Sequence, residues 1–180
     1  MFIVNLYQLM NKDLIWGHAN ARNYRNIILE KWEKSLDEML VLDFENITMI
    51  DFSAASDLIC IPISRIQTEL KEKHIIIKNA KNEVRENINV ALDRQELCCM
   101  NLLNDNDYEM LGKCSDGLKD ILDVLCKNKK ADSRTLADTL NTTVQVINNR
   151  TTTLTKLGLI IRKVEDAPTG GKQYIYESII

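Results

Sequence analysis

The sequence predicts an α/β (α+β) protein of two domains: a mixed sheet with helices over residues 1–112, then three helices and a β-hairpin over residues 113–180. Apolar spacing supports this division, because strand-like and helix-like patterns alternate in the first part, whereas helical patterns precede strands in the second. Charge supports it too, since residues 1–112 carry 12 basic and 18 acidic side chains and residues 113–180 carry 11 and 8. The resulting net charges, −6 and +3, favour polyanion binding by the second domain only.

The first domain begins with apolar strand formers. The runs Phe2–Leu9 and Leu14–Trp16, separated by the turn-forming residues 11–13, predict a β-hairpin. Residues His18 to Lys34 place apolar side chains on one face of a helix. A buried strand is predicted next, over Leu40–Phe44 and Thr48–Ile50.

A helical stripe from Ala55 to Leu70 continues through Pro62, which predicts a long helix kinked in its first half. A short apolar strand at 75–77 and a helix opened by Asn82 follow. Strands at 97–103 and 108–111, around a turn at 104–107, complete the predicted domain. The adjacent cysteines Cys98 and Cys99 would lie on opposite faces of their strand as small apolar fillers.

The first domain contains the run Val41-Leu42-Asp43-Phe44-Glu45-Asn46-Ile47-Thr48-Met49-Ile50-Asp51-Phe52-Ser53, followed by an amphipathic helix and by Ile75-Ile76-Ile77-Lys78. This segment resembles the STAS domains of anti-sigma factor antagonists. The resemblance covers residues 36–96 and is closer to STAS-like domains in which this segment follows a first helix. It implies a module that docks a protein partner.

In the classical STAS domains a serine just after the aspartate is phosphorylated by a partner kinase, and Ser53 occupies the matching position. A phosphate there would meet the free backbone N–H groups of a helix N-terminus. Ser53 could instead simply cap the helix. Phe52 and Ala54 depart from the small Ser and Gly of the family pattern.

In the second domain, Leu118–Cys126 and Ser133–Leu140 predict two helices, and a third from Thr142 to Leu157 ends at Gly158. The strands 159–165 and 173–176 form a hairpin around the segment 166–172. The 26 residues from Thr139 to Val164 contain four basic side chains and no carboxylate. That composition suits contact with phosphates and base edges.

The second domain also contains the patterns Leu136-Ala137-Asp138-x-Leu140 and Leu154-x-Lys156-Leu157-Gly158-Leu159-Ile160. With these patterns, the order of its elements resembles that of the winged helix-turn-helix regulators. The resemblance implies DNA binding, with the third helix in the major groove and the hairpin as the wing. The candidate base-reading residues are Thr143, Gln145, Asn148 and Asn149. The candidate phosphate contacts are Arg150, Lys156, Arg162, Lys163 and Lys172. Thr151 departs from the family, which has a large apolar residue there.

We therefore expect a cytoplasmic transcriptional regulator that binds double-stranded DNA as a homodimer and a protein partner through its STAS-like domain. The alternative is an adaptor of the anti-sigma antagonist type, whose winged helix docks protein and not DNA. No pairing of His18 or His74 with a nucleophile predicts catalysis. The five cysteines have neither zinc-ligand nor disulfide spacing, and the chain has no apolar run long enough for a membrane span, so no cofactor or membrane is expected.

Overall fold

The computed structural model describes residues 1–70, 72–104, 107–167 and 170–180. The chain divides into two compact units, unit 1 at Met1–Cys114 and unit 2 at Ser115–Ile180. The turn predicted at 104–107 and the hairpin tip predicted at 166–172 each include residues outside the described part of the chain.

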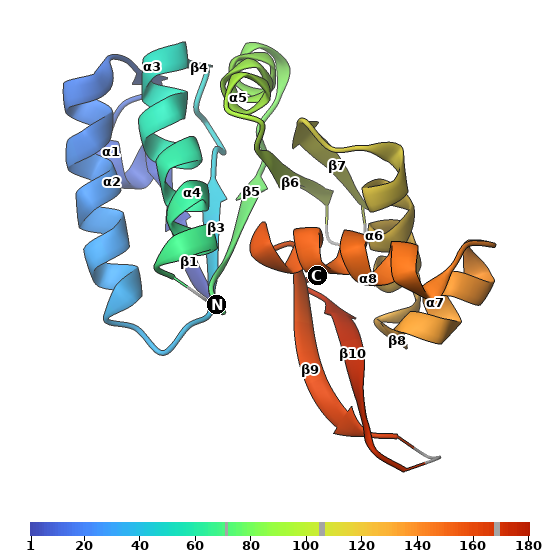
Figure 1. The fold of residues 1–180 in the computed structure, drawn as a ribbon. Helices are drawn as coiled ribbons and strands as arrows, with labels where there is room; N and C mark the ends of the chain where they lie inside the picture. The colour runs from blue at the N-terminus through green and yellow to red at the C-terminus, as the bar shows by residue number, and fades with distance from the viewer. Residues whose placement is uncertain (71, 105–106, 168–169) are drawn as a thin grey trace. The chain divides into compact units, whose positions relative to one another are not determined.

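Unit 1 contains a mixed five-stranded sheet, ordered β1-β3-β5-β6-β7 (Figure 1). The first four strands in this order are parallel, and β7 is antiparallel to β6. The strands are β1 (Phe2–Asn5), β3 (Met39–Asp43), β5 (His74–Lys78), β6 (Cys98–Asn104) and β7 (Asp107–Gly112). A second, two-stranded parallel sheet pairs β2 (Leu14–Ile15) with β4 (Met49–Ile50).

The helices of unit 1 gather beside one side of the large sheet, with α2 and α4 running next to each other (Figure 1). They share a core with alternate residues of the central strands, such as Leu40, Leu42, Ile75 and Ile77. The helical segments are α1 (Leu6–Met10), α2 (His18–Glu33), α3 (Phe52–Ala55), the π-helical turn η1 (Ser56–Cys60), α4 (Ile61–Thr68) and α5 (Asn82–Arg94). Cys99 belongs to this core, and Cys98 is buried but lies outside it, as alternation along a strand requires.

The N-terminal hairpin predicted from the sequence is wrong. β1 pairs in parallel with β3, and β2 pairs in parallel with β4, so the two runs never pair with each other. The chain between them forms α1, because the Asn5 side chain caps that helix by accepting a hydrogen bond from the Gln8 N–H at 2.9 Å. Leu6 and Met10, four residues apart, then face the core.

The interruption expected near Pro62 takes the form of a π-helical turn. Residues 52–68 are helical throughout, but η1 comes directly before α4, and the Ile61 N–H bonds to the carbonyl of Ser56, five residues earlier. Proline lacks an N–H and its ring would clash with the carbonyl four residues before it, that of Leu58. A wider turn relieves this clash without ending the helix.

The described residues of unit 2 form three helices and a three-stranded antiparallel sheet, ordered β8-β10-β9. Its elements are α6 (Asp116–Asn128), β8 (Lys130–Asp132), α7 (Ser133–Thr139), α8 (Val144–Lys156), β9 (Ile160–Asp166) and β10 (Lys172–Ser178). Its buried side chains come from all three helices and from the sheet, including Leu122, Leu136, Ile147, Leu154 and Tyr176. The sequence places these helices correctly but misses β8.

Candidate nucleic-acid interface

Helix α8 begins and ends where its sequence requires. Thr143 is the N-cap, and its hydroxyl accepts a hydrogen bond from the Val146 N–H at 3.3 Å. Gly158 follows the helix with a φ of 69°, a left-handed conformation that glycine adopts without strain. The side chain of Thr143 therefore serves the helix itself, and is less free to read a base than the sequence alone suggests.

Thr151 lies on the buried face of α8 together with Ile147 and Leu154, and all three are 0% exposed. Its hydroxyl donates to the carbonyl of Ile147 at 2.9 Å, so the buried polar group has a partner within its own helix. Val144, in contrast, is 40% exposed. The threonine thus completes the buried face of α8, where the sequence resemblance led us to expect a larger apolar residue.

The opposite face of α8 is exposed and polar. Gln145, Asn149 and Lys156 lie on this face, and their side chains form no hydrogen bond with any other residue in the described part of the chain. Asn148 is exposed as well, but its Oδ1 accepts a hydrogen bond from the Ser133 hydroxyl at 2.7 Å. An exposed face with free amide and ammonium groups and no carboxylate can contact base edges and phosphates.

The other four predicted phosphate contacts already have neighbours within unit 2. The guanidinium of Arg150 covers Gly117 in α6 so closely that a Cβ added there would lie 2.4 Å from Arg150 Cζ. Lys163 Nζ lies 2.6 Å from Glu177, and Lys172 Nζ lies 2.7 Å from Asp166. The Lys172 pair is largely exposed on both sides, so it can exchange for a phosphate at little cost.

Arg162 stacks on an aromatic ring of the β9–β10 hairpin. Its guanidinium lies 4.9 Å from the centroid of Tyr174, which is 48% exposed. Tyr174 pairs directly with Val164, itself 58% exposed. Stacking leaves the positive charge of Arg162 in place, so this part of the hairpin offers a cation, an aromatic ring and an apolar side chain together.

Three residues of the candidate interface were missed from the sequence. Arg134 is exposed on α7 and has no ion-pair partner among the described residues. Ser133 is recognisable only from the tertiary contact with Asn148, because 15 residues separate the two in the chain. Tyr174 could have been found from its alternation with Tyr176 along the strand.

In unit 1, Ser53 occupies the second position of α3 and is half-buried. The interpretation of Ser53 as the helix cap is wrong, because Asp51 is the N-cap. The Asp51 carboxylate accepts from the Ala54 N–H at 2.7 Å and from the Gly17 N–H at 3.1 Å. Phosphorylation of Ser53 stays a prediction.

The segment just before α2 in unit 1 also carries exposed apolar side chains. Trp16 is 63% exposed and Leu14 is 52% exposed. They border a small open hollow of about 110 Å³, to which Tyr24 and Lys12 contribute. A hollow with aromatic and apolar walls on a domain surface is suited to contact with another protein.

Two kinds of site find no support in the described part of the chain. Within the described residues, no group of three or more His, Cys, Asp or Glu side chains could hold a metal ion. No described helix combines the length and the apolar character that crossing a membrane requires.

No protein-family model matches the chain, and no curated protein matches it either.

Proposed function

We propose that the chain is a DNA-binding transcriptional regulator, in which unit 2 is a winged helix-turn-helix domain and unit 1 is a STAS-like domain that docks a protein or senses a signal. The element order of unit 2, with α8 followed by the β9–β10 hairpin, supports the assignment of α8 as recognition helix and of the hairpin as wing. Two recognition helices, one from each subunit of a homodimer, would reach paired half-sites one helical turn apart.

The single observation that carries the proposal is the exposed face of α8. Gln145 and Asn149 present free amides, Lys156 presents a free ammonium, and the stretch Thr139–Val164 contains no carboxylate to repel phosphates. Arg134 and Arg162 add exposed cations from α7 and the wing. Together these side chains provide phosphate contacts and donors and acceptors for base edges.

The second candidate is a protein-interaction adaptor, in which unit 2 serves docking and DNA is not a partner. The hollow beside Trp16 and the exposed Val164–Tyr174 pair favour it, because both surfaces are partly apolar. The ion pairs of Lys163 and Lys172 also reduce the positive charge that the wing presents.

Binding of the full chain to a fluorescently labelled, mixed-sequence DNA duplex distinguishes the two candidates. The informative variant is Lys156→Gln, because Lys156 is exposed on α8 and its loss leaves no described residue without a partner. Lys127→Gln on α6 is the matched control, since it removes the same charge from an exposed site outside α8 and the wing. Arg150→Ala is less informative, because it also removes the contact with α6.

A regulator that uses α8 should lose several-fold in affinity with Lys156→Gln and keep its affinity with Lys127→Gln. Absence of duplex binding by the unmodified chain would favour the adaptor. Equal losses from both lysine variants would mean that the charge of unit 2 attracts DNA without a defined role for α8.

A further inference from the structure

Ser133 connects the start of α7 to the exposed face of α8. It is the first residue of α7, directly after the cap residue Asp132. Its hydroxyl donates to Asn148 Oδ1 at 2.7 Å, and its Oγ lies 3.5 Å from the hydroxyl oxygen of Tyr176 in β10. Asn148 is thus held by a residue of another helix, whereas Gln145 and Asn149 on the same face have no such partner in the described part of the chain.

This contact determines which hydrogen-bonding groups Asn148 can offer. A free asparagine amide has an acceptor oxygen and a donor NH₂ group, and uses both to read the N6 and N7 atoms of adenine. The Oδ1 of Asn148 is directed at Ser133, so its Nδ2 remains to interact with a ligand. A group that donates matches a base edge that only accepts, and in the major groove guanine presents two such acceptors, N7 and O6, whereas thymine presents one, O4, and adenine presents one acceptor beside a donor.

We propose that Ser133 is a positioning residue that fixes the amide of Asn148 as a hydrogen-bond donor, so that α8 selects guanine over adenine at the base pair that Asn148 faces. The inference rests on the proposed function, because it assumes that α8 enters the major groove. Beyond that function, a preference for guanine is assigned to Asn148, and the cause of this preference is assigned to Ser133.

The test is selection of duplexes from a randomised DNA library by the full chain and by three variants. The unmodified chain should enrich a motif with guanine at the position read by Asn148. Asn148→Ala should lose the preference at that position alone, and so identify it. Ser133→Ala should free Oδ1 and shift the preference at the same position from guanine toward adenine by roughly tenfold. Ser133→Thr, which keeps the hydroxyl, should retain guanine.

Several outcomes would overturn the inference. Guanine selection that is unchanged in Ser133→Ala, but lost in Asn148→Ala, would show that Ser133 does not position the amide. A motif that Asn148→Ala leaves intact would show that Asn148 reads no base. Salt-dependent duplex binding by the unmodified chain without any enriched motif would refute the inference and leave DNA binding standing, whereas absence of any duplex binding would refute the proposed function as well.

Thermal unfolding of each variant serves as the control for folding. If Ser133→Ala fails to fold, Ser133→Thr and Asn148→Ala still decide the matter. Loss of the guanine preference in a folded Ser133→Thr chain would contradict a role that depends on the hydroxyl.

Discussion

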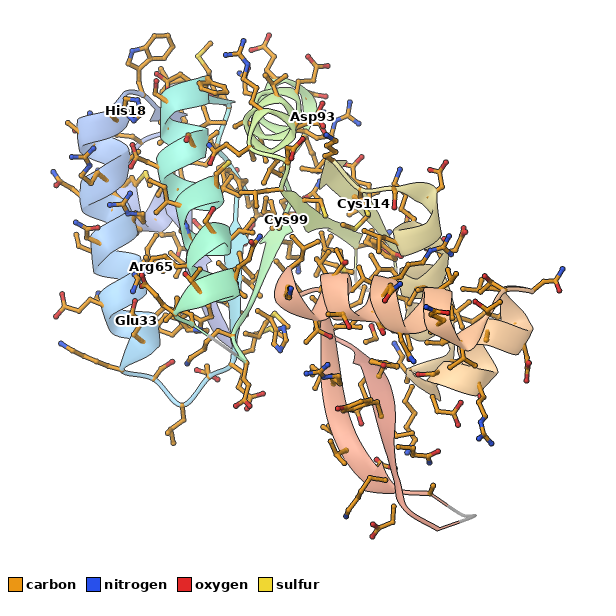
Figure 2. All side chains as sticks on the ribbon, viewed as in Figure 1. His18, Glu33, Arg65, Asp93, Cys99 and Cys114 are labelled. Atoms are coloured by element: carbon orange, nitrogen blue, oxygen red, sulfur yellow. The ribbon has the colours of Figure 1, made fainter. Side chains whose placement is uncertain are left out.

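Asp57 is 1% exposed, and basic side chains of α2 surround it. The guanidinium of Arg25 donates to its carboxylate at 2.7 Å, the Nδ1 of His18 contacts the other oxygen, and Arg22 lies 4.0 Å away. The π-helical turn η1 contains Asp57, so the irregular turn and the ion cluster occupy the same place. At its other end α2 is tied to α4 by the pair Glu33–Arg65 at 2.9 Å (Figure 2).

We predict that Asp57→Asn destabilises the protein by about 3 kcal/mol, because it leaves the largely buried Arg25 guanidinium without a counter-charge. The midpoint of urea unfolding, followed by circular dichroism, measures the effect. Glu30→Gln is the control, since it breaks the exposed pair with Lys34 and should leave the midpoint unchanged. Equal midpoints for the two variants would mean that the Asp57 cluster does not hold α2 in place.

Burial also determines how reactive the cysteine thiols are. Desolvation raises the pKa of the Cys60 and Cys99 thiols to about 12, so almost no thiolate is present at either site at pH 8. We expect an alkylating reagent to modify the partly exposed Cys126 in the folded chain, and Cys60 and Cys99 only after unfolding. Peptide mass spectrometry identifies the modified sites. Rapid modification of Cys99 without unfolding would contradict its place in the core.

The same shift has a defined sign for stability. The folded-state pKa of each thiol exceeds that of an unfolded cysteine, so ionisation favours the unfolded chain. The stability that the folded chain gains from these protonated thiols is fully present below about pH 9, and it is lost as the pH rises toward about 12. Within this window the urea midpoint should fall less steeply in a Cys99→Ala variant than in the unmodified chain.

At the scale of elements, two glycines with different surroundings give opposite predictions. Gly112 ends β7 with a φ of 82°, and a Cβ there would lie 2.3 Å from the carbonyl oxygen of Leu97 and 2.6 Å from Leu92 Cβ. Gly117 lies in the first turn of α6, where the atoms nearest to an added Cβ belong to the flexible end of Arg150.

We expect Gly112→Ala to cost roughly 3 kcal/mol of unfolding free energy, because it combines a strained backbone with a clash against main-chain atoms. Gly117→Ala should be close to neutral, since the gain in helix propensity, about 1 kcal/mol, offsets the displacement of Arg150. Urea unfolding of both variants checks this. A neutral Gly112→Ala would mean that β7 does not end in the left-handed conformation.

Elements whose signals are local could be predicted from the sequence. Thr143, the apolar spacing of α8 and Gly158 define that helix without help from the rest of the chain, and Ile75–Ile77 define β5 in the same way. The N-terminal strands could not be assigned correctly, because the choice between a hairpin and parallel pairing depends on β3 and β4, more than thirty residues away. The only local evidence against the hairpin was Asn5, which caps α1.

The sequence predicted which segment forms the candidate site. It did not predict which of the side chains in that segment are available to a ligand. The acid-free stretch from Thr139 to Val164 identified α8 and β9. Whether a cation is available, however, depends on tertiary neighbours: Arg150 is engaged by α6, and Lys163 by β10. Lys156 and Lys163 look alike in the sequence, and only their surroundings separate them.

At the scale of the whole molecule, charge is divided unequally between the units. Residues 1–114 carry 13 basic and 18 acidic side chains, a net charge of −5, and residues 115–180 carry 10 and 8, a net charge of +2. The structural boundary moves Lys113 into unit 1, so unit 2 is slightly less basic than the sequence division suggested. Unit 1 should therefore oppose the approach of DNA through long-range repulsion.

We predict that the fragment 115–180 binds duplex DNA more tightly than the full chain at low salt. Its own buried core predicts that it folds alone, which circular dichroism checks. The difference in affinity should shrink as salt rises, because screening shortens the reach of the charges of unit 1 to about 10 Å at 0.1 M ionic strength. Weaker binding by the folded fragment would mean that unit 1 contributes contacts of its own.

The most direct test of the central claim, that unit 2 binds DNA through α8 and the wing, is the salt dependence of duplex binding by the full chain. With three to four phosphate contacts, affinity should fall roughly 40- to 150-fold between about 50 and 200 mM salt, and Lys156→Gln should lower the slope of log affinity against log salt by about one. Affinity that does not change with salt, or a slope that Lys156→Gln leaves unchanged, would contradict it.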